Sequence, residues 1–287
     1  MGLEVNSFGL TISSVPLGTQ PATAQGTAVT PGNLTYGSYA QLLSATSDDS
    51  CEVEIGINSV GITATARDCL VTIGWDPAGG TNYGASALVT IPDLIAACAS
   101  GYVGAANGFG GGVPYRFNLR IPAGSSIAAK AMVNSATLTS LNVWCKLRCR
   151  PSRPHLIYVG SFVEAYGVSL ATAAGTSMTP GTAARGAYVS LGTLTKNYSQ
   201  VEYGFGCNDA TMSNIGYEVD VAIGDVTNKD LVIEGAVVTA NNAEVLTKQP
   251  GHGRLWMMAA GQSIFARSQA NTTPDSAISV AAYLVGG

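Results

Sequence analysis

The residues of this 287-residue chain that could carry chemistry are few and scattered. Its two histidines, His155 and His252, lie far from each other and from the cysteine pairs, so zinc ligation has no motif behind it. The G-x-S-x-G, S-x-x-K and H-E-x-x-H patterns are absent, and the Gly-rich run 108–112 lacks the Lys-Ser/Thr pair of a phosphate loop. Asp48 and Asp49 would suit calcium, but the D-x-D-x-D-G spacing is missing. We therefore expect no catalytic residues, no cofactor and no metal centre.

The remaining reactive side chains are six cysteines, Cys51, Cys69, Cys98, Cys145, Cys149 and Cys207. No C-x-x-C occurs, and we expect buried thiols, which pack as small apolar groups. The alternative is a set of disulfides, within or between subunits, formed in an oxidising medium. Cys145 and Cys149 stand four apart in a predicted strand, which places them on one face about 13 Å apart. They therefore cannot bond to each other while that strand stays extended.

Three tryptophans, Trp75, Trp144 and Trp256, are the aromatic candidates for stacking against a carbohydrate. All three fall within or beside predicted strands. We therefore interpret them as core residues or interface anchors, because large aromatic side chains dominate the energetics of cores and interfaces.

Composition indicates a folded, assembling protein with little surface charge. Only 11% of the residues are charged, 46% are hydrophobic and the formal charge is −4. Such a surface does little to keep subunits apart. A nucleic-acid partner is not expected, since no basic face stands out and the pI is about 5.1. No segment reaches the roughly 18 apolar residues that span a bilayer. The N-terminus lacks a signal peptide, so we expect synthesis in a cytoplasm without export by that route.

One heptapeptide pattern occurs twice, at Gly26–Gly32 and again 149 positions later at Gly175–Gly181. Gly37, Tyr39 and Leu42 follow the first copy at the spacings that Gly186, Tyr188 and Leu191 keep after the second. Self-similarity at a fixed offset indicates repeated structural units. We therefore predict an internal duplication, with a first module at residues 1–150 that includes an N-terminal segment, a Pro-containing linker at 151–154 and a second module at 155–287.

Within each copy the hydrophobic pattern is that of strands. Residues 51–58 alternate with period two, as a half-buried strand does. Other predicted strands of the first copy lie at 10–15, 36–46, 68–75, 87–91, 115–121, 126–133 and 138–147. The stretch 92–98 is predicted as a short helix, because proline is tolerated in a first helical turn. In the second copy, 218–224 is matched to 68–74, with Gly224 opposite Gly74. The fold class is all-β, as two tandem β-sandwich or jelly-roll-like domains.

Three runs carry a resemblance: Thr-Pro-Gly followed by Gly-x-Tyr, then 66–74, then 121–130. With them the chain resembles duplicated β-sandwich virion structural proteins of tailed bacteriophages. The resemblance implies a virion component made in the host cytoplasm and assembled in multiple copies with other capsid, neck or tail proteins. It would serve as a head decoration, a collar or a reinforcing component. The alternative is a module of a tail or head fibre that binds a host receptor or a surface glycan.

Overall fold

The computed structural model describes residues 4–5, 11–14, 26–60, 67–98, 114–134, 140–149, 159–170, 174–207, 215–241, 244–248, 257–272 and 278–287. Their regular elements are strands, apart from one 3-10 turn at Ala87–Val89. This confirms the predicted all-β class, and the helical turn is far too short to cross a bilayer. We refer to the residues up to 149 as the first half and to those from 159 as the second half. The predicted linker, 151–154, lies outside the described residues.

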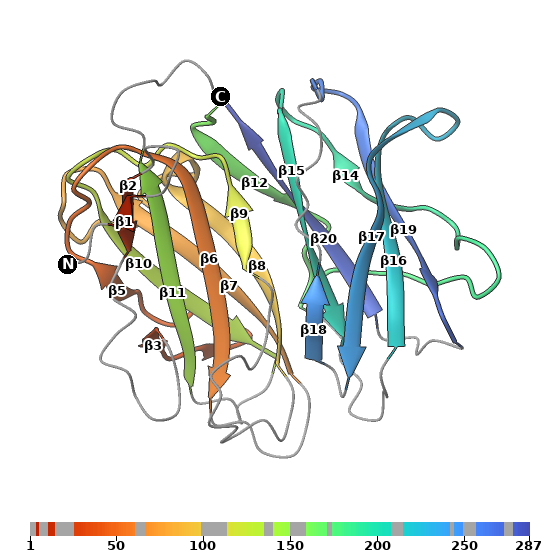
Figure 1. The fold of residues 1–287 in the computed structure, drawn as a ribbon, viewed down its shortest axis with the longest axis horizontal. Coiled ribbons are helices and arrows are strands. Elements are labelled where there is room, and N and C mark those ends of the chain that lie inside the picture. The colour runs from red at the N-terminus through yellow and green to blue at the C-terminus, as the bar shows by residue number, and fades with distance from the viewer. Residues whose placement is uncertain are drawn as a thin grey trace.

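In the first half, two sheets face each other (Figure 1). One sheet has the order β1 (Glu4–Val5), β2 (Thr11–Ser14), β11 (Ser140–Cys149), β6 (Ser50–Val60) and β9 (Tyr115–Phe117), with β3 (Thr27–Val29) also paired to β11. The other has the order β4 (Gly32–Asn33), β10 (Ser126–Val133), β7 (Arg67–Asp76) and β8 (Thr90–Cys98), with β5 (Ala40–Leu43) also paired to β10.

The second half also has two sheets. One has the order β12 (Phe162–Tyr166), β20 (Ile278–Gly286) and β13 (Thr176–Ser177), with β15 (Gln200–Cys207) also paired to β20. The other has the order β14 (Val189–Thr193), β19 (Ser263–Ala270), β16 (Ile215–Gly224), β17 (Lys229–Asn241) and β18 (Glu244–Lys248).

The two halves share one pattern of strand pairing. The neighbours of β11 are β2, β3 and β6, and those of β20 are β12, β13 and β15 at matching places in the chain. The series β5, β10, β7, β8 likewise has the same order as β14, β19, β16, β17. Sandwich-like packing of paired sheets thus agrees with the predicted architecture, while the duplication itself remains an inference from the repeated sequence and this shared order.

The predicted helix at 92–98 is wrong, because these residues belong to strand β8. Strand β8 as a whole pairs antiparallel with β7, from Arg67↔Cys98 to Gly74↔Thr90. Pro92 does not interrupt this ladder since it lies in a β-bulge, where a missing N–H is tolerated. The apolar run that follows it is buried, as a continuous apolar strand requires. The strand predicted at 87–91 is partly wrong as well, because the chain makes a 3-10 turn up to Val89.

The strand register also corrects one match between the copies. Ser126 of β10 lies opposite Asp76, and Ser263 of β19 lies opposite Gly224. If Ser126 and Ser263 are equivalent, as the sequence indicates, Gly224 is the counterpart of Asp76 and not of Gly74. The sequence match was two residues off because both strands end in similar Ile-Gly pairs.

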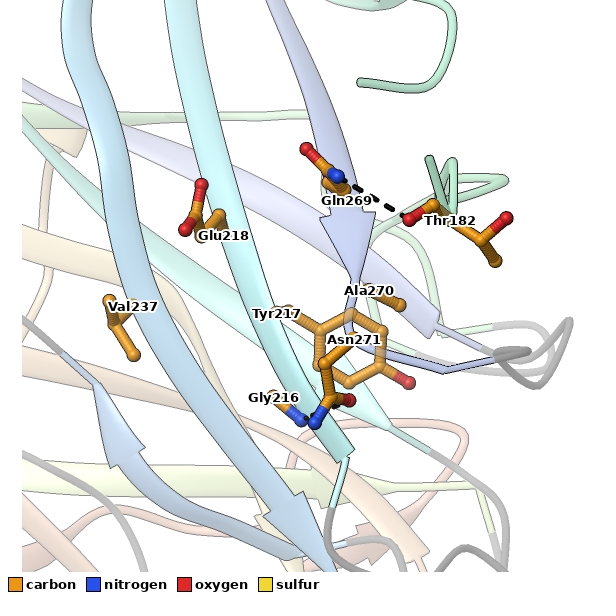
Figure 2. Close-up of a pocket in the computed structure, with 8 residues that line it drawn as sticks. All are labelled: Thr182, Gly216, Tyr217, Glu218, Val237, Gln269, Ala270 and Asn271. Carbon is orange, nitrogen blue, oxygen red and sulfur yellow. Dashed lines mark hydrogen bonds between the residues drawn. The ribbon is translucent and has the colours of Figure 1, made fainter. Parts of the chain in front are cut away.

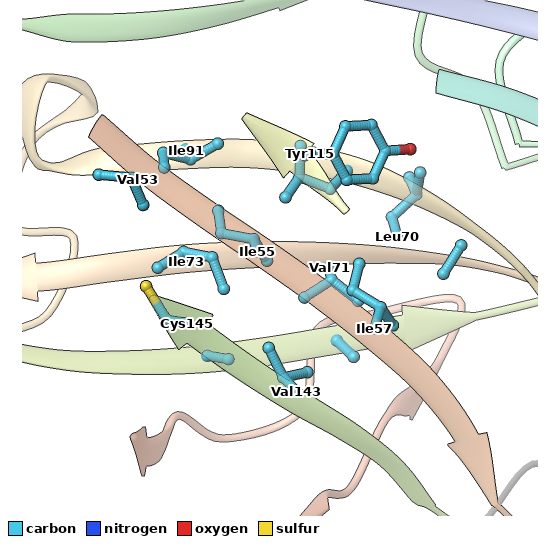
Figure 3. Packing of buried hydrophobic residues seen from close by; sticks show 14 of the residues in the cluster. Val53, Ile55, Ile57, Leu70, Val71, Ile73, Ile91, Tyr115, Val143 and Cys145 are labelled. Atoms are coloured by element: carbon cyan, nitrogen blue, oxygen red, sulfur yellow. The ribbon is translucent and has the colours of Figure 1, made fainter. Parts of the chain in front are cut away.

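A hydrophobic core fills the space between the sheets of each half. In the first, Val53, Ile55 and Ile57 of β6 face Val71 and Ile73 of β7 (Figure 3). The second core is built from the inward residues of β15, β16, β19 and β20. Alternation along these strands therefore points one set of side chains into each sandwich.

The halves are joined because one sheet is buried on both of its faces. Every residue of β20 is buried, and its alternate side chains serve different cores. Val280, Ala282 and Leu284 pack in the core of the second half, whereas Ala281 and Tyr283 belong to the core of the first. The β15–β20 sheet is thus a layer shared by both halves, which fixes their relative placement.

Candidate functional site

A polar cluster of the first half forms at the β-bulge of β8. Two residues, Pro92 and Asp93, lie opposite Thr72 of β7, and Asp93 has the left-handed φ of 56°. Its N–H donates to Thr72 Oγ1 at 3.2 Å, and its Oδ1 accepts a hydrogen bond from the Tyr36 hydroxyl. Lys130 Nζ lies 4.7 Å from the centre of the Tyr36 ring. Burial, with the Asp93 carboxylate second, raises the pKa of Tyr36 well above its usual value.

A second polar cluster forms at a bulge of β17. Gly235, with a φ of 60°, lies with Glu234 opposite Asp220 of β16. The Gly235 N–H donates to Asp220 Oδ1 at 2.8 Å. The Oδ2 atom of this carboxylate, which is only 1% exposed, accepts bonds from Arg185 Nε at 3.1 Å and Arg267 Nε at 2.8 Å. Two guanidinium groups thus hold one buried carboxylate, the arrangement that a buried charge requires.

The two clusters occupy matching places in the register. Lys130 lies opposite Thr72, and Arg267 lies opposite Asp220. In each cluster a left-handed bulge residue donates its N–H to the side chain of the central strand. The carboxylate of the first cluster belongs to the bulge residue Asp93, whereas that of the second belongs to Asp220 on the central strand. The polar groups of both clusters are paired with groups around the bulges, so the clusters stabilise the bulges and present no aligned nucleophile and base.

Beside the second cluster lies a pocket of about 340 Å³. It is lined by Thr182, Gly216, Tyr217, Glu218, Val237, Gln269, Ala270 and Asn271 (Figure 2). Gln269 Nε2 donates to the carbonyl of Thr182 at 3.4 Å, and Asn271 Oδ1 accepts from the N–H of Gly216 at 3.0 Å. Three adjacent strands, the segment before β14 and the residue after β19 therefore supply its walls. No sequence motif marks this pocket, because its residues are far apart in the chain.

The carboxylate of Glu164 forms a third polar centre, on β12. It accepts hydrogen bonds from Tyr166 at 3.1 Å and Thr195 at 2.9 Å, and also from Tyr198 and Lys196. Burial works to raise the pKa of Glu164, but these four bonds outweigh it and lower the pKa to about 2. The group therefore stays ionised at neutral pH and ties β12 to the segment before β15.

The cysteines are spread over several strands. Cys145 is 1% exposed in the first core, where burial, and then the charge of Glu54, raise the pKa of its thiol to about 12. Such a thiol is a poor nucleophile. Cys51 donates to the carbonyl of Arg148 at 3.2 Å, and Cys69 is buried on β7. The remaining three, Cys98, Cys149 and Cys207, lie on β8, β11 and β15, and their side chains are outside the described part. Whether disulfides form therefore stays a prediction.

The tryptophans have different environments. Trp75 is 2% exposed in the first core. Trp144 is half-buried and covers Gly56, where an added Cβ would lie 2.0 Å from the Trp144 Cε2 atom. Trp256 lies outside the described residues. In the contact between the halves, the ring of Tyr283 meets that of Tyr115 edge to face at 5.5 Å and that of Phe117 edge to face at 6.4 Å. Neither tyrosine is marked as a contact residue by any motif in the sequence.

Other candidate residues of the sequence analysis have structural roles or cannot be placed. Asp49 accepts hydrogen bonds from the Ala123 N–H and, second in effect, from Arg120, and these bonds lower its pKa. Nowhere in the described ranges do three His, Cys, Asp or Glu side chains gather as a metal site would require. The Gly-rich run 108–112 and both histidines, His155 and His252, lie outside those ranges.

No protein-family model and no curated protein matches the chain. Among solved structures it is similar to PNGF-II in two crystal forms, with 11% and 12% identity and TM-scores of 0.35 and 0.37. The matches cover 96% of this chain but only 59% and 60% of PNGF-II. It is also similar to the CBM22-1–CBM22-2 tandem domain of Paenibacillus barcinonensis Xyn10C, at 12% identity, a TM-score of 0.23, and 99% and 93% coverage. Likenesses at these scores carry no inference about function.

Proposed function

We propose that this chain is a structural component of a tailed-bacteriophage virion, assembled in multiple copies on the head, neck or tail. The sequence resemblance suggests this role, and one structural observation supports it most. The β15–β20 sheet is shared between two cores, so the two sandwiches form one stiff unit. Domains of one chain usually move relative to each other unless their interface is large and apolar. A stiff double sandwich is well suited to a load-bearing position in a particle.

Besides this apolar layer, directional hydrogen bonds join the two halves. The Gln200 side chain accepts from the N–H of Asn118 at 2.8 Å and donates to the carbonyl of Arg116 at 3.2 Å. Nearby, the N–H of Gly160 donates to the carbonyl of Asn118 at 2.9 Å. Partly buried hydrogen bonds of this kind are costly to leave unmade, so they favour one relative orientation of the halves.

Two buried carboxylates are paired with arginines, as is usual in a structural protein. Asp220 is held by two arginines, and Glu54, with 10% of its side chain exposed, is held by Arg148 at 3.4 Å and Arg116 at 3.5 Å. These carboxylates are paired and shielded, whereas an active site needs titratable groups that converge on a vacant position. A non-enzymatic role is therefore part of the proposal.

Cross-linking and mass spectrometry on intact particles test this role. The proposal predicts cross-links between surface lysines of this chain and at least one other virion protein, together with links between copies of the chain. Particles that contain the chain only as an unlinked, substoichiometric contaminant would count against it.

A further inference from the structure

We propose that the pocket over β16 and β19 binds a neutral saccharide through Glu218, Gln269 and Asn271. Its volume of about 340 Å³ lies at the small end of ligand sites, which suits one or two sugar rings. Carboxylate and amide groups can each engage neighbouring hydroxyl groups of a sugar. The site is separate from the proposed virion role, since a building block can assemble without any glycan.

Two polar groups of the pocket, those of Glu218 and Gln269, are held in place by Arg185. One guanidinium, that of Arg185, donates to Glu218 Oε2 at 2.5 Å and to Gln269 Oε1 at 3.0 Å. Arg185 is in turn anchored on the buried carboxylate of Asp220. Side chains fixed in this way lose little freedom when a ligand binds, which is what a pre-organised site requires.

The same contacts favour an uncharged ligand. The Arg185 guanidinium already faces three acceptors, on Asp220, Glu218 and Gln269, so it offers little to an anion. Glu218 is paired with that guanidinium and is the only carboxylate among the lining residues, which is a poor site for a cation. A ligand rich in hydroxyl groups matches the amides and the exposed edge of this carboxylate.

An apolar wall completes the match to a sugar. Val237 is 39% exposed beside the polar groups, and Ala270 lines the same hollow. Sugar rings present C–H groups on their faces and hydroxyl groups at their edges, so they suit a pocket with one apolar wall and several polar groups. Gly216 leaves the hollow open, because it has no side chain to fill it.

The matching place in the first half is apolar. Leu70 and Met132 lie opposite each other there, as Glu218 and Gln269 do in the second half. Leu70 is 1% exposed and belongs to the first core, whereas the Glu218 side chain is 53% exposed. The same position of the pairing pattern is thus core in one half and a polar hollow in the other. Exposure to solvent explains why the residues here are polar. It does not explain why they form a pocket or why Arg185 holds them in place.

The test is an NMR titration of the full ¹⁵N-labelled chain with glucose, galactose, N-acetylglucosamine and rhamnose, each added separately. Calcium chloride and sodium acetate serve as charged probes. At least one sugar is expected to shift the amide signals of residues 216–218 and 269–271, with a Kd of about a millimolar, as is usual for so small a ligand. The absence of shifts with all four sugars, or shifts with the charged probes alone, would overturn the proposal.

Two variants and a control make the assignment specific. Gly216→Val fills the hollow, and its Cβ makes only an ordinary contact of 3.7 Å with Asn271. It should abolish the shifts, and Glu218→Ala should weaken binding about tenfold. Asp230→Ala removes an exposed carboxylate of β17 outside the pocket and should leave binding unchanged. Unaltered binding by both pocket variants would refute the site, and Glu218→Ala decides alone if Gly216→Val does not fold.

Discussion

The hydroxyl of Tyr283 on β20 accepts a hydrogen bond at 2.8 Å from the backbone N–H of Ile95 on β8. The same hydroxyl donates to the carbonyl of Asp93 at 2.9 Å. Asp93 is the left-handed bulge residue whose side chain binds Tyr36. One tyrosine of the second half therefore satisfies the backbone beside the bulge of the first, and it couples the polar cluster to the contact between the halves.

Replacing Tyr283 by Phe keeps the ring and removes both hydrogen bonds. The N–H of Ile95 then stays buried without its acceptor, which should lower the free energy of unfolding by about 1–3 kcal/mol. Urea denaturation measures the loss, and hydrogen exchange at Ile95 should quicken. Tyr188→Phe makes the same change on a half-buried tyrosine of the second half, whose ring centre lies 4.5 Å from the Arg267 guanidinium, and it should cost less. Equal losses of stability in the two variants would show that the hydrogen bonds of the Tyr283 hydroxyl do not stabilise the contact between the halves.

How far the sequence predicts this arrangement depends on the residue. Strict alternation at 51–58 is enough to locate β6, and the strand predicted at 68–75 agrees with β7 to within one residue at each end. The run 92–98 carries no alternation because its strand is largely buried, so it resembles a short helix. Periodicity also cannot show that Tyr283 serves the other half, since a strand buried on both faces is simply apolar throughout.

Sequence periodicity does not predict the pocket or the two polar clusters at the bulges. Gly235 carries a weak signal, because a glycine within a strand often marks a bulge. Asp93 gives no signal, since its left-handed φ is stabilised by contacts with Thr72 and Tyr36 that are distant in sequence. Glu218 and Gln269 become neighbours only through the register of β16 with β19.

Gly204 on β15 makes room for the aromatic contact between the halves. An added Cβ there would lie 2.8 Å from the Tyr115 hydroxyl and 2.9 Å from that of Tyr283. Gly204→Ala should therefore lower the free energy of unfolding by about 1–3 kcal/mol through overpacking. Gly216→Ala is the matched control, since its Cβ meets nothing closer than 3.7 Å and a strand position tolerates alanine well. A Gly204→Ala variant as stable as this control would contradict the close packing.

Asp220 should be very sensitive to substitution, because its buried carboxylate is shared by two arginines. Asp220→Ala leaves two arginines without their shared carboxylate and should cost about 3 kcal/mol in chemical denaturation. Asp220→Asn should cost less, because an amide oxygen can still accept from the Gly235 N–H. Asp230→Asn, an exposed carboxylate on β17, should have almost no effect. The loss in the free energy of unfolding should be largest for Asp220→Ala, smaller for Asp220→Asn and smallest for the control. A loss from Asp220→Ala no larger than the control's would contradict this expectation.

Acid should weaken the Glu164 centre over a defined range of pH. The pKa of this carboxyl is lowered from 4.5 to about 2 in the folded chain. Its contribution to stability is therefore complete above about pH 4.5 and is lost as the pH falls toward 2. Urea midpoints measured across that range should fall more steeply for the natural chain than for Glu164→Gln. Glu234→Gln, at an exposed position, should follow the natural chain, and identical slopes for all three would remove the assigned role of Glu164.

The central claim is that this stiff double sandwich is built into a virion, and particle composition tests it most directly. Particles purified through a density gradient from the cells that produce this chain should contain it at a fixed ratio to the major capsid protein. Quantitative mass spectrometry across the gradient fractions should show the two rising and falling together. A chain that remains in the soluble fractions, while the particle peak lacks it, would contradict the account.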